Sequence, residues 1–457
     1  MYDGWELPLV RDSFGSTFGA IAAAAGAAVG LGNIWNFPYM TGRNGGGAFL
    51  LIYVLAIVVI GVPIMVSEFV LGKRGKRNII GSLKSLAPDT RWHWVGWFCV
   101  TACFLILAFY GVIAGWSFAH AAKELGGLFN TLGANQVEAH FLRHIAHPFW
   151  PVFWHLLFMT ATAAIVVAGV RQGIERFSKI FMPVLLSILI LLALRSVTLN
   201  GAAAGLSFLF QPDFSKINAQ TILVALGAAF FSLGIGNGVM VTFGSYLRDD
   251  TEIGGMALKV SVTDTAVAII AGVAIFPAVF ALGYAPADST GLAFITVPSV
   301  FQSVPGGAVM HYLLTLLFFL LLSIAALTSS VATLEVVVAT VTEEFGMDRR
   351  RAPFFIAGIM FLIGVPCALS LGAVPINVLG MAFFDFVILL VEGLFLPVGG
   401  LLIVLFVGWR LSKQDVVSAL APDGNKPWYL SGYLVLIRFV VPVLIVAVLL
   451  KTLLDGL

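Results

Sequence analysis

The stretch Gly26-Ala-Ala-Val-Gly-Leu-Gly-Asn-Ile-Trp-Asn-Phe-Pro38 decides how this chain folds. It lies inside an apolar segment long enough to cross a membrane, yet it contains three glycines and the polar side chain of Asn33. Hydrocarbon cannot hydrogen-bond a free peptide group, so such a break is stable only where protein or a water-filled site satisfies the opened backbone. The stretch therefore predicts a broken spanning helix with a binding site at the break.

The rest of the chain has the composition of a polytopic helical membrane protein. Of its 457 residues, 60% are hydrophobic and only 11% are charged, and apolar runs of about 20 residues recur from end to end. The net charge of +2 is too small to indicate nucleic acid as a partner. The three cysteines lie in apolar segments and are expected to be small core residues.

Apolar runs separated by Gly, Pro or charge clusters predict eleven spans. These cover residues 14–40, 48–72, 94–124, 149–170, 177–197, 220–246, 257–284, 309–342, 353–371, 376–408 and 430–454. Lys and Arg gather in one alternate set of loops, including the run from Lys73 to Arg91 and the triplet Arg349-Arg-Arg351. The positive-inside rule makes these loops cytoplasmic, which predicts an N-terminus inside and a C-terminus outside a bacterial inner membrane.

A second break interrupts the sixth span at Phe231-Ser-Leu-Gly-Ile-Gly-Asn-Gly238. The two breaks are five spans apart, so two five-helix units that each begin with a broken helix have opposite orientations, as in inverted-repeat transporters. We expect a first repeat over residues 1–200, an inverted second repeat over 201–408, and a loop and eleventh helix over 409–457.

Polar side chains inside spans are costly and mark candidate site residues. Most of them here carry oxygen, which hard cations such as sodium prefer, and no His or Cys set at mid-membrane indicates zinc or redox chemistry. Glu68 has a structural interpretation, holding backbone amides of an unwound neighbour. Thr328-Ser-Ser330 is open to two interpretations, packing or ligation. In the loop 126–148, His140, His144 and His147 predict a surface helix rather than a metal site.

These residues carry a family resemblance. The first break, followed by Phe37-Pro-Tyr39 and Asn44-Gly-Gly-Gly-Ala-Phe49, resembles the signature of the neurotransmitter:sodium symporter family, specifically its bacterial amino-acid transporters. Supporting matches are Phe230-Phe-Ser-Leu233, Gly272-Val-Ala-Ile-Phe276 and Ala326-Leu-Thr-Ser-Ser330. The resemblance implies an all-α fold of two inverted five-helix repeats with broken helices 1 and 6 and one extra C-terminal helix.

The resemblance also implies two sodium ions. The first site would comprise Ala28, Asn33, Ser232 and Asp264, the last of these chosen over its neighbour Thr263 because a bound cation would explain a buried carboxylate. The second site would comprise the carbonyls of Gly26, Val29 and Ala325 and the hydroxyls of Thr328 and Ser329. An ionised Asp264 offsets one sodium charge, so we expect the empty carrier to protonate it before returning.

The implied substrate is an amino acid held between the two breaks. Its carboxylate would face N–H groups at Leu31 and Gly32 and the hydroxyl of Tyr110. Family members that carry monoamines have an Asp at the position of Gly30, so Gly30 indicates a substrate that brings its own carboxylate. Around the rest of the substrate the resemblance places Ala28, Ile106, Ile113, Phe231, Ser232, Gly234, Asn237, Ser329 and Thr333.

Gates and a release segment are implied as well. Arg11 and Glu343 match an inner ion pair, whereas the outer pair is incomplete, because Asn36 replaces the usual Arg opposite Asp385. Gly173 and Pro183 match a segment whose unwinding admits water to the second sodium site. The sequence thus predicts a sodium-coupled amino-acid importer and not an enzyme, because the common hydrolase motifs are absent. A proton-coupled carrier of the same fold is the alternative.

Overall fold

The computed structural model describes residues 12–133, 136–283 and 291–456. Arg11, a predicted gate residue, lies outside these residues. Within them, nine helices are long and apolar enough to cross a membrane, and ten if the bent pair Thr17–Ala28 and Gly32–Arg43 counts as one span. The remaining predicted span, at residues 220–246, is present as two shorter helices.

The elements of the first five spans follow in chain order. They are α1 (Thr17–Ala28), the π-helical turn η1 (Gly32–Asn36) and α2 (Phe37–Arg43); α3 (Gly47–Ala56), η2 (Ile57–Gly61) and α4 (Val62–Gly75); α6 (His93–Leu125); α9 (Trp150–Val167); and η4 (Val170–Glu175) with α10 (Arg176–Val197).

The remaining spans continue the bundle. They are α12 (Ala219–Leu233) with α13 (Val239–Ser245); α14 (Ile253–Ala281); α16 (Gly307–Phe345); α17 (Ala352–Leu369); α18 (Phe383–Leu390), η7 (Val391–Phe395), α19 (Leu396–Leu405) and η8 (Phe406–Arg410); and α21 (Leu430–Val435), η9 (Leu436–Val440) and α22 (Val441–Gly456).

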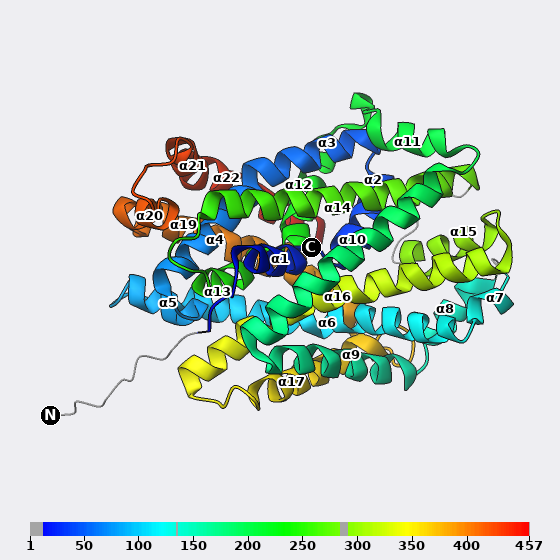
Figure 1. The fold of residues 1–457 in the computed structure, drawn as a ribbon, viewed down its shortest axis with the longest axis horizontal. Coiled ribbons are helices and arrows are strands. Elements are labelled where there is room, and N and C mark those ends of the chain that lie inside the picture. The colour runs from blue at the N-terminus through cyan, green and yellow to red at the C-terminus, as the bar shows by residue number, and fades with distance from the viewer. Residues whose placement is uncertain (1–11, 134–135, 284–290, 457) are drawn as a thin grey trace.

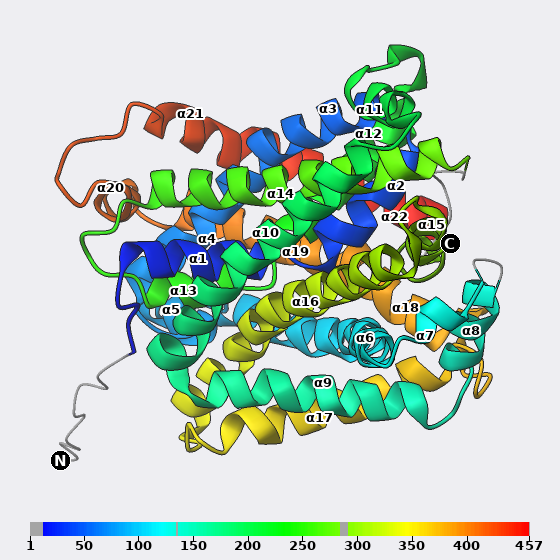
Figure 2. The ribbon, with the colours of Figure 1, turned by 45° about the vertical axis from the view of Figure 1, so that its right-hand side comes forward.

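Short elements lie at the two ends of the bundle (Figures 1 and 2). The basic end, named for the Lys and Arg residues that follow α4, carries α5 (Ile79–Leu86) and α20 (Lys413–Leu420). The opposite end carries α7 (Leu128–Thr131), α8 (Val137–Ile145), α11 (Ala202–Phe210), η5 (Phe214–Lys216), η6 (Leu292–Thr296), α15 (Val297–Ser303) and the hairpin of β1 (Asn377–Val378) and β2 (Met381–Ala382). The last span starts at the basic end with α21 and finishes at the opposite end with α22, as an odd number of crossings requires.

The fifth predicted span began too late. The sequence placed it at 177–197, whereas helical structure starts at Val170, directly after α9 and the two residues that follow it. The turn is possible because Gly169 has a φ of +83°, a conformation that side chains disfavour. In Figure 2, α9 and α17 then run side by side along one face of the bundle.

Both predicted breaks are present. α1 ends at Ala28, Val29 is extended with φ −71° and ψ 100°, and the chain becomes helical again at an angle of 52°. In the sixth span the helix stops at Leu233, and Gly234, Gly236 and Gly238 all have positive φ before α13 begins. Glycine is the residue that adopts this conformation without a Cβ clash, which is why the second break is rich in it.

Glu68 supports the second break, as the sequence predicted. Its fully buried carboxylate accepts hydrogen bonds from the backbone N–H groups of Gly236 at 2.6 Å and Met240 at 3.2 Å. These amides have lost their helical acceptors, and a charge-assisted bond replaces what hydrocarbon could not supply. The prediction that Glu68 holds an unwound neighbour is confirmed.

Candidate functional site

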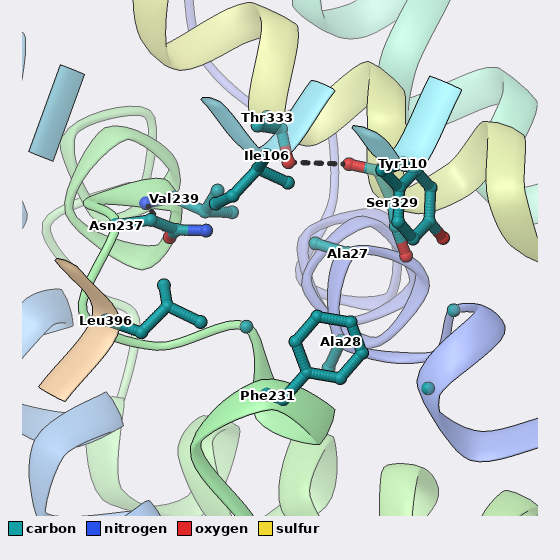
Figure 3. A pocket seen from close by; sticks show the side chains of 13 residues that line it. Ala27, Ala28, Ile106, Tyr110, Phe231, Asn237, Val239, Ser329, Thr333 and Leu396 are labelled. Atoms are coloured by element: carbon teal, nitrogen blue, oxygen red, sulfur yellow. Dashed lines mark hydrogen bonds between the residues drawn. The ribbon is translucent and has the colours of Figure 1, made fainter. Parts of the chain in front are cut away.

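A cavity lies where the two breaks face each other (Figure 3). The volume open to water-sized molecules is about 50 Å³. α1, α6, α12 and α16 surround it, and α19 closes one side. The lining residues are Ala27, Ala28, Gly30, Gly32, Ile106, Tyr110, Phe231, Gly234, Asn237, Val239, Ser329, Thr333 and Leu396.

Most of the predicted substrate residues line this cavity, and three do not. Leu31 and Ser232 are buried beside it, and Ile113 is buried elsewhere on α6. Three apolar lining residues were missed from the sequence: Ala27, Val239 and Leu396. Their apolar side chains look like core in a sequence, and only the packing of α19 and α13 against the break brings them to the cavity.

Gly30 has a steric role that the amino-acid sequence alone does not reveal. A Cβ added there would lie 2.6 Å from Ser329 Oγ and 2.9 Å from Tyr110 Oη, both closer than side-chain atoms approach. Tyr110 also accepts a hydrogen bond from the backbone N–H of Leu31 at 3.2 Å. The absence of a side chain thus lets two hydroxyl groups reach the opened backbone of the first break.

A buried oxygen cluster joins the two breaks to α14. Asn33 Nδ2 donates to Asp264 Oδ1 at 2.7 Å and to Ser232 Oγ at 3.1 Å. The Ser232 hydroxyl donates to Asp264 Oδ2 at 2.9 Å. Three of the four residues predicted for the first sodium site therefore meet around one carboxylate, which we call the carboxylate cluster.

Asp264, rather than Thr263, is the α14 residue in this cluster. Asp264 is fully buried, whereas Thr263 is partly exposed and its hydroxyl donates back to the Lys259 carbonyl at 2.8 Å. The sequence missed one member. Tyr53, buried on α3, donates to Ser232 Oγ at 2.7 Å. The signal was present as a hydroxyl inside an apolar span, but an aromatic ring is also ordinary core.

A second oxygen cluster joins α1 to α16 and contains no charged group. The Ser329 hydroxyl lies 3.4 Å from the Gly26 carbonyl and 3.3 Å from the Val29 carbonyl. Thr328 Oγ1 lies 3.4 Å from the Val29 carbonyl and 2.9 Å from that of Ala325. These are the five residues predicted for the second sodium site. We call them the hydroxyl cluster, and such oxygens suit a hard cation.

At the basic end, the predicted gate residue Glu343 is held by hydrogen bonds from Asn78. Glu343 Oε2 accepts hydrogen bonds from the backbone N–H of Asn78 at 2.8 Å and from its side-chain amide at 3.0 Å. Phe14 packs edge-on against Phe243 and Tyr246.

A buried ion pair that the sequence did not predict lies behind this packing. Tyr246 donates to Glu335 Oε1 at 2.6 Å, and Arg349 donates to both Glu335 oxygens at 2.9 and 2.7 Å. Although burial opposes it, the Glu335 carboxylate raises the pKa of the Arg349 guanidinium above its usual value. The triplet Arg349-Arg-Arg351 therefore has a structural member, besides its predicted role in topology.

The structure also places the residues of the predicted outer gate and of the predicted release segment. Asp385 is exposed at the start of α18, Asn36 is partly buried, and within the described chain no hydrogen bond joins them. Gly173 lies in η4 and Pro183 inside α10, and this segment is helical throughout. Neither arrangement tests a gating role.

The histidines near the opposite end form a basic cluster. Lys123 Nζ donates to His140 Nε2 at 3.2 Å and to His144 Nδ1 at 3.3 Å. Burial and the nearby ammonium group lower the pKa of His140 to about 4 and that of His144 to about 3, so both rings are neutral at pH 7. Among the described residues, no group of three His, Cys, Asp or Glu side chains is arranged to hold a metal ion.

Comparison with known proteins identifies the family. Residues 11–129 and 136–455 match the sodium:neurotransmitter symporter family. The chain is 40% identical over 441 residues to an uncharacterized sodium-dependent transporter, YhdH, of Bacillus subtilis, covering 95% of this chain and 96% of that protein. It is 32% identical over 458 residues to an uncharacterized sodium-dependent transporter of Haemophilus influenzae, covering 97% and 98%.

A solved structure confirms the predicted fold class. The crystal structure of MhsT in complex with L-phenylalanine superposes with a TM-score of 0.90 at 42% identity, covering 97% of this chain and all of that one. This chain belongs to the sodium:neurotransmitter symporter family and is a membrane transporter, not an enzyme.

Proposed function

We propose that this protein imports an amino acid together with sodium ions by alternating access across a bacterial plasma membrane. The observation that carries the proposal is the cavity between the two breaks, which has the carboxylate cluster beside its wall and no cationic side chain in its lining among the described residues. An amino acid that brings its own carboxylate can be neutralised there by a sodium ion and by N–H groups of the broken helix.

The proposed substrate position follows from the lining. The carboxylate would lie near Gly30, Gly32 and the Tyr110 hydroxyl, and the ammonium group near carbonyls freed at Ala28, Phe231 and Ser232. The solved complex of MhsT with L-phenylalanine supports a substrate of this class. Two sodium ions, one at the carboxylate cluster and one at the hydroxyl cluster, are the proposed coupling ions.

Asn237 is the proposed determinant of side-chain preference. Its Oδ1 accepts a hydrogen bond from the Val239 N–H at 3.1 Å, and its amide nitrogen has no partner among the described residues. Thr333, in contrast, donates to the Ser329 carbonyl at 3.0 Å and is already satisfied (Figure 3). A substrate with a small or medium side chain that accepts a hydrogen bond fits this wall.

Competition binding tests the proposal. Purified protein in sodium buffer is challenged with each of the twenty amino acids, and the series is repeated in potassium buffer and with Asn237→Phe. We expect saturable, sodium-dependent binding of a subset of amino acids, and a shift toward smaller side chains with Asn237→Phe because the ring fills the cavity. Binding that does not depend on sodium but changes with pH would instead support a proton-coupled carrier.

A further inference from the structure

A buried carboxylate lies under the start of α1 and has no part in the oxygen clusters described above. Glu175 ends η4, just before α10, and its side chain is 2% exposed. It is separated by 159 residues in sequence from the Ser16 side chain that it contacts. A buried carboxylate is costly unless its partners are in place, so its contacts indicate what it holds.

Those contacts fasten the first turn of α1. The backbone N–H of Gly15 donates to Glu175 Oε2 at 2.6 Å, and the Ser16 hydroxyl donates to Oε1 at 3.0 Å. The same Ser16 oxygen caps α1 by accepting from the N–H of Gly19 at 3.0 Å. The carboxylate therefore orders the helix cap as well as the chain that leads into it.

Cationic side chains surround the carboxylate. Lys179 Nζ lies 2.5 Å from Glu175 Oε1, one helical turn along α10. Arg171, Arg176 and Lys179 line a cavity of about 210 Å³ around Glu175 and Gly15. This positive surrounding replaces part of the hydration that the buried carboxylate has lost.

Gly19 shows how tightly α1 lies over this group. A Cβ added at Gly19 would overlap the Glu175 carboxylate. The position lies within the helix and has no unusual φ, so its glycine is explained by close approach and not by backbone conformation. No side chain fits between α1 and the carboxylate.

We propose that Glu175 is the latch that positions α1 against η4 and α10. The far end of the same helix supplies the Gly26, Ala28 and Val29 carbonyls to both proposed sodium sites, so release of the latch would move ligands at the other end. The latch also lies inside the predicted release segment from Gly173 to Pro183. Unwinding of that segment would therefore free α1 in the same step. The role of the latch in ion release rests on the proposed function.

Hydrogen–deuterium exchange of the full chain in lipid nanodiscs tests the latch. With Glu175→Gln we expect amides within Thr17–Ala28 to exchange about tenfold faster, because a charge-assisted contact and its ion pair are lost. The control is Glu252→Gln, because Glu252 makes a matching pair of bonds, from the Gly255 N–H at 2.6 Å and the Tyr429 hydroxyl at 3.1 Å, at the start of α14. It should leave α1 exchange unchanged.

For a second variant, Gly19→Ala, the latch and helix propensity predict opposite changes in the exchange rate of α1. Gly19→Ala adds a better helix former and would ordinarily slow exchange in α1. If the latch is real, Gly19→Ala displaces the carboxylate and speeds exchange instead. Equal α1 exchange in Glu175→Gln and Glu252→Gln, or slower exchange in Gly19→Ala, would overturn the latch.

Comparing sodium with potassium buffer separates this test from the proposed function. If the variants behave as expected but sodium does not protect α1 in the unmodified protein, the latch stands and the sodium assignment fails. If sodium protects α1 in the unmodified protein but α1 exchanges at the same rate in Glu175→Gln and Glu252→Gln, the latch is wrong and the sodium assignment stands.

Discussion

The two oxygen clusters differ in charge although both are built on the same broken helix. The carboxylate cluster contains Asp264, which accepts hydrogen bonds from Asn33 and Ser232. The hydroxyl cluster has only the neutral oxygens of Thr328, Ser329 and three carbonyls. The first brings an ionisable carboxylate to a cation, and the second brings only neutral oxygens.

The hydrogen bonds within the clusters follow this difference. In the carboxylate cluster, amide and hydroxyl protons point at the Asp264 carboxylate. In the hydroxyl cluster, each hydroxyl donates to backbone carbonyls. A sodium ion held by Asn33 and Asp264 needs an oxygen from each, so the Asn33 amide has to turn and present Oδ1 in place of Nδ2.

The largest expected effect comes from removing the charged member. With Asp264→Ala we expect sodium-dependent substrate binding to weaken by roughly a hundredfold or more, since both a cation ligand and the acceptor of two buried donors are lost. Isothermal titration with sodium at fixed substrate measures it. Asp264→Asn is the control that keeps an oxygen and removes the charge. It should retain sodium dependence but abolish proton movement opposite to sodium in loaded vesicles, and undiminished proton movement would contradict the protonation step.

A smaller loss is expected at the neutral cluster. With Ser329→Ala or Thr328→Val we expect sodium affinity to fall by about tenfold, because one neutral oxygen is lost and the carbonyls remain. The same titration measures it, with Ser323→Ala as control, since Ser323 lies on α16 but donates only to the Phe319 carbonyl. A loss equal to that of Asp264→Ala would contradict the ranking of the two clusters.

The smallest effect is expected from Tyr53, which donates a hydrogen bond to Ser232 of the carboxylate cluster. Tyr53→Phe removes only the hydroxyl that donates to Ser232, so we expect sodium affinity to fall about three- to sixfold, as for one neutral hydrogen bond. Stability is measured in parallel by thermal unfolding, because the ring itself packs against Phe37 and Phe49. Unchanged sodium affinity with lowered stability would make Tyr53 a structural residue only.

Sequence reasoning succeeded where a local composition had one physical solution. Glycine-rich polar breaks inside apolar runs predicted both interrupted helices, and a carboxylate near the end of a span predicted that Glu68 holds free amides. It failed where partners come from distant elements with ordinary sequences. Leu396 and Arg349 carry no local signal, because a leucine or a loop arginine is common in any membrane protein. The polar groups of Tyr53 and Glu335 inside apolar spans do carry a signal, but it does not tell which residues they meet.

The sequence by itself predicted a series of apolar membrane-spanning segments with breaks in the first and the sixth, because hydrocarbon allows few ways to satisfy a backbone. Only the tertiary structure decided which side chains complete the breaks. Asp264 rather than Thr263 faces Asn33, and Glu175 meets the start of α1, because such contacts depend on the rotation and crossing of packed helices. A periodic pattern sets the buried face of a helix, but not the atom it meets there.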